Sequence, residues 1–313
     1  MTLCATASRE WDEPVAGTAA VARTWLLVEQ PGPWGAKALT GSRLDPGLGR
    51  ALDAAAAGSG VRVALIRRPG RHPVGPGTAS RTVYAASADP AHPWVHAAHA
   101  ADPAALLDLD FGALGAGEHR GFDRLLCGGP HAGAPLAFVC TNGRRDRCCA
   151  ALGRPLAQEL AASGHEGIWE VTHLGGHRFA PTVLVLPFGY AYGRVGGADV
   201  KDILREARLG RVVLDGCRGN STWPRPAQAA ELALRARLGE HTAGALRVLA
   251  VEGGAPAWAV TLAHTDGRRW RVDVAEGPAG PPRPESCGAA LGTPATMTPG
   301  APRELAPDTA GTG

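Results

Sequence analysis

The chain has 313 residues, of which 45% are apolar and 19% charged, a globular composition that is long enough for two domains. Its net charge of +3, from 32 basic and 29 acidic residues, is too small to indicate binding to nucleic acid or attraction to a membrane surface. No apolar run of 18 residues occurs, and the chain opens without a basic segment followed by an apolar one, so a cytoplasmic protein is predicted. Seven cysteines, an odd number, argue against a disulfide framework and favour reduced thiols, some of them metal ligands.

The first half of the chain predicts alternating strands and helices. Apolar runs predict strands at 22–29, 61–67, 82–86 and 94–98, and small residues predict a helix at 44–57. The Gly- and Ala-rich residues 111–135 are interpreted as a connector. A small basic cluster follows the second predicted strand and comprises Arg67, Arg68, Arg71 and His72. It is interpreted either as a solvated loop or as a contact for an acidic partner.

Two cysteines follow a predicted strand in the middle of the chain. The strand, 136–139, leads to Cys140, and a polar loop then closes at Cys148 and Cys149. Eight residues separate Cys140 from Cys149, and Cys148 is the alternative partner. A helix is predicted at 150–162, because leucines four residues apart give it one apolar face.

Two histidines follow the next predicted strand, 168–172. His173 and His177 flank Leu-Gly-Gly, and the two glycines let the backbone pass close to a bulky group. Two strands and a helix are predicted after them, at 182–186, 190–195 and 199–208.

Cys140, Cys149, His173 and His177 have the residue types and spacing of a metal centre. Thiolates and imidazoles are the ligands of zinc and of iron-sulfur clusters, and both pairs lie in loops at strand ends, where side chains can converge. The spacing alone leaves zinc and iron-sulfur equally open. The competing interpretation is that Cys148 or Cys149 is an ordinary buried thiol and that the histidines cap or bridge loops.

The last third of the chain predicts a small α+β unit. A helix is predicted at 226–239, and strands are predicted at 246–251, 258–263 and 269–274. From about residue 292 the chain is rich in Pro, Gly and Thr, so a disordered tail is predicted over 292–313.

The central residues carry a resemblance to a known family. The run CTNGRRDRCC at 140–149, followed by HLGGHRFAPTVLVLPFGYAYGRV at 173–195, resembles the sucrase/ferredoxin-like family, whose pattern is C-x8-C followed by H-x-G-G-H. The segment 17–39 also resembles the start of that family. The resemblance covers most of residues 1–220, and the two Cys/His motifs are its most specific part.

The resemblance implies a thioredoxin-like ferredoxin domain at 116–220 that binds a 2Fe-2S cluster, with the ligands Cys140, Cys149, His173 and His177. The element order in 1–115 parallels the order in that domain, which implies a preceding cofactor-free thioredoxin-like domain within an α/β (α+β) fold. A C-terminal α+β extension is expected at 221–291. The implied function is electron transfer with an unknown redox partner, a reductase or an acceptor, and the ionisable imidazoles suggest coupling to protons.

Two other functions stay open from the sequence. One is a zinc-stabilised interaction module that uses the same two cysteines and two histidines, and the other is a thiol oxidoreductase that uses Cys148 and Cys149. Sucrose hydrolysis is not supported, because no pair of carboxylates stands out. An electron carrier is therefore expected rather than a catalyst.

The sequence supports three further expectations, about the other cysteines, the nearby arginines and Asp146. The remaining cysteines are predicted not to be ligands, because none belongs to a second convergent pair, and they are Cys4, Cys127, Cys217 and Cys287. Four arginines bracket the ligands, where they either face solvent or stabilise added electron density, and they are Arg144, Arg145, Arg147 and Arg178. Asp146 is expected to pair with one of them.

Overall fold

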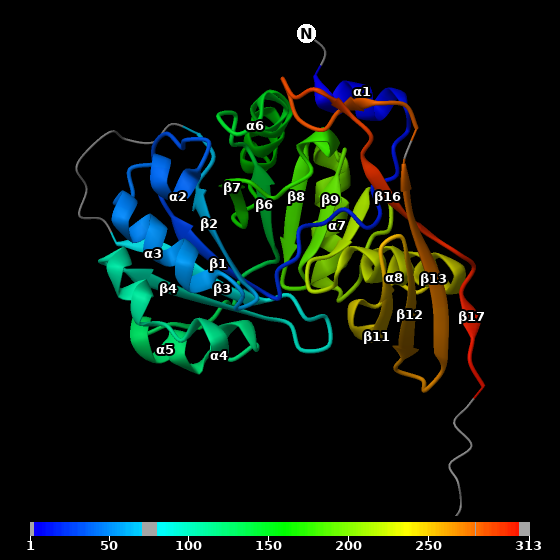
Figure 1. Ribbon diagram of the computed structural model, residues 1–313. Coiled ribbons are helices and arrows are strands. Elements are labelled where there is room, and N and C mark those ends of the chain that lie inside the picture. The colour runs from blue at the N-terminus through cyan, green and yellow to red at the C-terminus, as the bar shows by residue number, and fades with distance from the viewer. Residues whose placement is uncertain (1–2, 71–79, 279, 307–313) are drawn as a thin grey trace, which may run out of the picture.

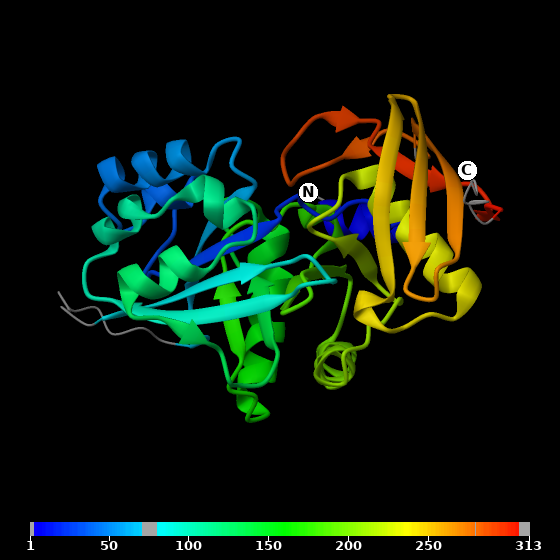
Figure 2. The same ribbon diagram turned by 90° about the horizontal axis from the view of Figure 1, so that it is seen from below.

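The computed structural model describes residues 3–70, 80–278 and 280–306, and these residues form a mixed α/β fold, as the sequence predicts. Ten strands form one sheet in the order β10-β9-β8-β6-β7-β2-β1-β3-β4-β5, and five strands near the C-terminus form a second sheet. Figure 1 shows the blue and cyan N-terminal half beside the green central region. Figure 2 shows the yellow and orange second sheet on the side of the molecule opposite the N-terminal half.

The first half of the large sheet is a β-α-β-β-β unit. Strands β1 (Thr24–Glu29) and β2 (Val61–Arg67) are parallel and are connected through helix α3 (Pro46–Ala56). Strand β3 (Arg81–Ser87) pairs antiparallel with β1, and β4 (Trp94–Ala100) pairs antiparallel with β3.

The second half repeats this topology. Strands β6 (Leu136–Cys140) and β7 (Ile168–Val171) are parallel and are connected through helix α6 (Arg147–Ala162). Strand β8 (Thr182–Leu186) pairs antiparallel with β6, and β9 (Tyr190–Gly193) pairs antiparallel with β8. The element order that the sequence suggested for the two halves is therefore present in the strand pairing.

The two units join into one continuous sheet. Strands β2 and β7 pair antiparallel through Ile66 with Val171 and through Arg67 with Glu170. The sheet consequently runs across residue 115, where the sequence suggested a domain boundary.

Helices pack against each unit. In the first unit Leu26 and Leu65 pack with Leu52 of α3 and with residues of α4 (Phe111–Gly115) and α5 (Arg120–Leu126). In the second unit Val139 and Ile168 pack with α6 and with α7 (Gly197–Arg208). No helix in the described part of the chain combines the length and the apolar character that are needed to cross a membrane.

Side chains on the other face of both units share one core. Tyr84 on β3 contacts Phe138 on β6 edge to face, with ring centroids 6.2 Å apart. Strands β1, β2 and β7 lie between these two strands in the sheet order, so the sheet must be strongly curved for them to touch. Trp169 on β7 joins the same core, with its ring centroid 5.7 Å from that of Tyr84.

Two predictions about irregular segments are wrong. The expected connector at 111–135 contains α4, α5 and β5 (Gly129–Pro130). The expected disordered tail forms strand β16 (Ala295–Pro299), which pairs with β13 (Arg269–Pro278) and buries Met297. The prediction failed because composition alone does not reveal that β13 offers an edge for pairing, and pairing with that edge orders the segment. Residues 307–313 lie outside the described part of the chain.

The C-terminal extension packs one helix on the second sheet. Helix α8 (Arg225–Leu238) buries Ala230 and Leu234 against Val260 and Trp270 of that sheet. The other elements are α1 (Cys4–Glu10), α2 (Ala38–Gly41), β10 (Cys217–Asn220), β11 (Leu246–Gly254), β12 (Ala257–His264), β14 (Arg283–Pro284), β15 (Leu291–Gly292), β17 (Arg303–Glu304), and the short 3-10 helices η1 (Pro103–Asp108), η2 (His177–Phe179) and η3 (Ala243–Ala245).

Candidate metal centre

Cys140 and the two histidines lie at the same edge of the sheet. Strands β6 and β7 are parallel, and Cys140 pairs with Val171, so both strands end at this edge. The Cys140 thiol donates a hydrogen bond to the carbonyl of Thr172 at 3.0 Å. His173 follows directly, so the first histidine emerges beside the first cysteine.

The first turn of α6 brings Cys149 to this edge. Asp146 caps the helix by accepting a hydrogen bond from the N–H of Cys148 at 2.8 Å. Gly153 lets the helix approach β6 closely, because a Cβ at this position would overlap the carbonyl oxygen of Cys140. Cys149 packs in the same core as Cys140, whereas Cys148 packs in a separate cluster. This register favours Cys149 over Cys148 as the partner of Cys140.

Two glycines and a buried arginine shape the loop between the histidines. Gly175 and Gly176 have φ of +81° and +65°, which favour glycine. The fully buried Arg218 donates hydrogen bonds to the Gly175 carbonyl and to Thr18 Oγ1, each at 3.0 Å. A Cβ on Gly176 would overlap the Arg218 guanidinium. The loop holds the two imidazole rings with their centroids 5.2 Å apart.

A second arginine holds the start of the same loop. Arg62 on β2 donates a hydrogen bond to the carbonyl of His173 at 2.8 Å and lies over the ring of Trp25. Burial lowers the pKa of Arg62, while the Cys140 thiolate opposes this shift. Burial also lowers the pKa of Arg218, to about 9. Sequence reasoning missed both arginines, and the one available sign was that Arg62 interrupts the apolar strand at 61–67.

The ionisation of the candidate ligands suits metal binding. A hydrogen bond with Cys149 lowers the pKa of Cys140, and His173 and the Leu174 N–H add to this effect. The same contact with Cys140 raises the pKa of Cys149. Burial lowers the pKa of His177, although Asp146 opposes this shift. A thiolate at Cys140 and a neutral imidazole at His177 are the forms that bind metal ions.

The histidines also present unsatisfied nitrogen atoms. The Nδ1 atoms of His173 and His177 are buried and have no hydrogen-bond partner among the described residues. A buried polar atom without a partner destabilises the fold by about 1–3 kcal/mol. A metal group bound to these atoms would remove that penalty, so the donor set fits such a group.

The spacing of the four candidate ligands bears on the kind of metal group. Within the described ranges, no three of their ligand atoms lie within 4.8 Å of one another. Ligand atoms around a single tetrahedral zinc ion are about 3.3–3.8 Å apart, because Zn–N and Zn–S bonds are short. Cys140, Cys149, His173 and His177 are therefore spread more widely than one zinc ion requires.

Of the two roles left open for the arginines that bracket the motifs, the structure favours contact with solvent for three and an internal ion pair for the fourth. Arg178 forms an ion pair with Glu13 at 2.8 Å. Asp146 forms no ion pair with any of these four arginines, all of which the structure describes, and instead accepts hydrogen bonds from two backbone N–H groups, those of Cys148 and Cys287. The other three arginines near the motifs are exposed to solvent: Arg144, Arg145 and Arg147.

The basic cluster after β2 is partly engaged within the fold. Arg67 pairs with Glu170 at 2.6 Å, and Arg68 lies over the ring of Trp169. Arg71 and His72 lie outside the described residues. The part of this cluster that the structure describes is thus held by its own neighbours.

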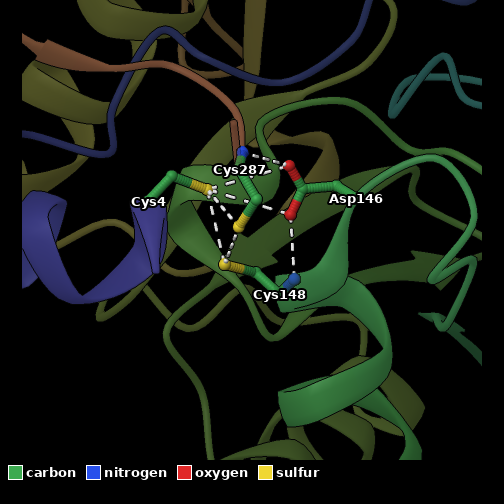
Figure 3. Close-up of side chains that lie close together, drawn as sticks. All are labelled: Cys4, Asp146, Cys148 and Cys287. Atoms are coloured by element: carbon green, nitrogen blue, oxygen red, sulfur yellow. Dashed lines mark hydrogen bonds between the residues drawn. The ribbon is translucent and has the colours of Figure 1, made fainter. Parts of the chain in front are cut away.

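Figure 3 shows a cluster of three thiols, from Cys4, Cys148 and Cys287. The sequence did not predict this cluster. The Sγ atoms are 3.4 Å apart for Cys4 and Cys148, 3.2 Å for Cys148 and Cys287, and 3.7 Å for Cys287 and Cys4. The prediction that none of the four remaining cysteines belongs to a second convergent group is wrong for Cys4 and Cys287. Sequence separations of 144 and 139 residues hid this contact from any local pattern.

The other two cysteines belong to no compact ligand group in the described ranges. Cys127 is exposed, and Cys217 is buried in the core of the second unit. Burial raises the pKa of Cys217 to about 12, so this thiol stays protonated. By contrast, a hydrogen bond with Cys4 lowers the pKa of Cys148 to about 6.

Comparison with known proteins identifies the family. The family model described as sucrase/ferredoxin-like matches residues 15–219. No curated protein and no solved structure matches the chain. The matched region covers both β-α-β-β-β units, and it contains the four candidate ligands together with Arg62 and Arg218. Since the match spans more than half of the chain, the protein belongs to the sucrase/ferredoxin-like family.

Proposed function

We propose that this protein binds a 2Fe-2S cluster and acts as an electron carrier, with Cys140, Cys149, His173 and His177 as ligands. When bound, such a cluster accepts and donates single electrons. The main support is the pair of buried Nδ1 atoms on His173 and His177 that lack hydrogen-bond partners among the described residues. They belong to a loop that begins beside Cys140, whose pKa is lowered by its hydrogen bond with Cys149.

Arg62 and Arg218 suit a site that receives negative charge. Arg62 and Arg218 hold the carbonyls of His173 and Gly175, and so fix the loop from which both imidazoles project. Arg218 is fully buried and Arg62 is partly buried, so both guanidinium groups lie where the access of water is reduced. A cation stabilises nearby negative charge more strongly there than in water, because the local dielectric constant is low.

The burial of the ligands indicates where a redox partner would approach. Cys140 and Cys149 are buried, while His173 and His177 are partly exposed. The imidazoles therefore form the side of the site that is nearer to solvent. A partner that docks over the histidines would lie closer to the cluster than one that docks elsewhere.

The two other hypotheses have less support. A zinc ion held by the same four residues would require their ligand atoms to lie closer together than they do in this structure. A thiol oxidoreductase that uses Cys148 and Cys149 as a pair conflicts with their packing, because the two thiols lie in different clusters.

Metal analysis of the purified protein tests the proposal. Protein purified without oxygen is expected to contain about two iron and about two acid-labile sulfide per chain and to show visible absorption that reduction bleaches. Cys127→Ser is the control, because it changes an exposed thiol outside both clusters and should leave the spectrum unchanged. A colourless protein that contains zinc but neither iron nor sulfide would contradict the proposal.

A further inference from the structure

The three thiols of Cys4, Cys148 and Cys287 surround a position beside the Asp146 carboxylate (Figure 3). The Cys4 Sγ atom lies 3.8 Å from Asp146 Oδ1 and 3.9 Å from Asp146 Oδ2. Cys4, Cys148 and Asp146 are buried, and Cys287 is partly exposed. The four residues thus offer four potential ligand atoms that all lie within 4.8 Å of one another.

The carboxylate is held in place by backbone groups. Asp146 Oδ1 accepts a hydrogen bond from the N–H of Cys148, and Oδ2 accepts one from the N–H of Cys287, both at 2.8 Å. The N–H of Ala5 points at the Cys148 sulfur at 3.5 Å. Each carboxylate oxygen keeps a second lone pair, and the hydrogen bonds orient the group as outer-shell partners orient a metal ligand.

We propose that Cys4, Cys148, Cys287 and Asp146 form a second metal site, which binds a thiophilic divalent cation, Zn²⁺. Zinc is bound tetrahedrally by thiolates and carboxylates, and a Zn–S bond of about 2.3 Å sets two sulfur ligands about 3.8 Å apart. The three Sγ separations of 3.2 to 3.7 Å are slightly shorter than this value. Small outward movements of the thiols open the position to the ion.

Zinc accounts for the group better than a disulfide does. A disulfide joins two sulfur atoms at about 2.05 Å and would leave the third thiol and the carboxylate without a role. A divalent cation engages all four groups at once. It would also balance the charge of the buried carboxylate, which lies among thiols and has the Nε2 of His177 at 3.6 Å from its Oδ2.

The site joins three distant parts of the chain. Cys4 opens helix α1, Cys148 lies in the first turn of α6, and Cys287 lies between β14 and β15. Figure 1 shows α1 beside the orange segment above α6. A bound ion would fasten both end segments to the turn of α6 that also carries Cys149. This role is structural and does not depend on whether the neighbouring centre holds iron and sulfide.

Zinc analysis of the full-length protein tests this site. Protein produced with zinc and iron in the medium is expected to hold about one zinc per chain in addition to its iron. Cys287→Ser removes the least buried ligand and should lower the zinc content by about tenfold or more without lowering the iron content. Cys127→Ser is the matched control and should keep both metals. Wild-type protein without zinc, or Cys287→Ser protein that keeps it, would overturn the site.

A crystallographic measurement covers the case in which the variant does not fold. An anomalous difference map of the wild type at the zinc absorption edge should show a peak among the three Sγ atoms. Absence of that peak would overturn the proposal, as would an intact mass two hydrogens below that of the reduced, zinc-free chain, because that mass indicates a disulfide. If zinc is lost from the Cys287 variant but the wild type contains no iron, only the electron-carrier function is contradicted. If zinc is lost from the Cys149 variant and kept in the Cys287 variant, both the second metal site and the electron-carrier function are contradicted.

Discussion

Cys149→Ser is expected to lose nearly all of the iron and visible absorption, whereas Cys148→Ser keeps both. The two cysteines are adjacent, but Cys149 shares a core with Cys140 and Cys148 contacts Cys4 and Cys287. Loss of an outer-shell partner already weakens metal binding by roughly 10- to 100-fold, and loss of a ligand should exceed that. Absorption spectra and iron content of the two variants, purified side by side without oxygen, measure the difference.

The same pair of variants separates the two metal sites. Cys148→Ser should lose zinc and keep iron, and Cys149→Ser should do the reverse. Iron lost from Cys148→Ser but kept in Cys149→Ser would transfer the ligand role to Cys148. Such a result would also mean that the helix register seen at the start of α6 is not the one that binds the cluster.

Gly176→Ala is expected to be the most damaging substitution in the histidine loop. Gly176 has a φ of +65°, and a Cβ there would overlap the guanidinium of Arg218, which is fully buried and held by Thr18 and Gly175. The left-handed conformation alone costs an alanine about 1 kcal/mol. Displacing a buried, hydrogen-bonded arginine should bring the total to about 3 kcal/mol or more.

Gly210→Ala is the matched control for this prediction. Gly210 has a φ of +73°, but no atom lies within 4 Å of the position that its Cβ would occupy. Its substitution should therefore lower the melting temperature only slightly and leave the iron content unchanged. Gly176→Ala should lower both. Equal effects of the two substitutions would show that Arg218 does not constrain the loop.

Local patterns in the sequence were sufficient for most of the strands and the main helices. The apolar runs at 61–67 and 182–186 predict β2 and β8 with their observed bounds. Local patterns fail where tertiary contacts determine the secondary structure. Gly and Ala at 111–135 suggested a connector, but α4 and α5 form there and bury Phe111 and Phe122 against the first unit. They fail again at β16, which is ordered by pairing with β13.

In the candidate site too, the local sequence reveals some residues, and others become visible only in the folded chain. The paired cysteines and histidines are visible in sequence because each pair lies in one short segment. Arg62 and Arg218 were missed because a charged residue is expected at the surface, and nothing local shows that these two contact the histidine loop. The contact of Cys4 with Cys287 spans 283 residues and becomes visible only when the fold brings the two ends together.

Pulsed electron paramagnetic resonance of the reduced protein, labelled with nitrogen-15 histidine, tests the central claim most directly. Ligation by two cysteines and two histidines predicts couplings between the cluster spin and the nitrogen atoms of two imidazoles, which change when nitrogen-14 is replaced by nitrogen-15. His177→Cys should remove one of these couplings. A reduced cluster whose spectrum shows no coupling to histidine nitrogen, and no change on labelling, would contradict the assignment of His173 and His177 as ligands.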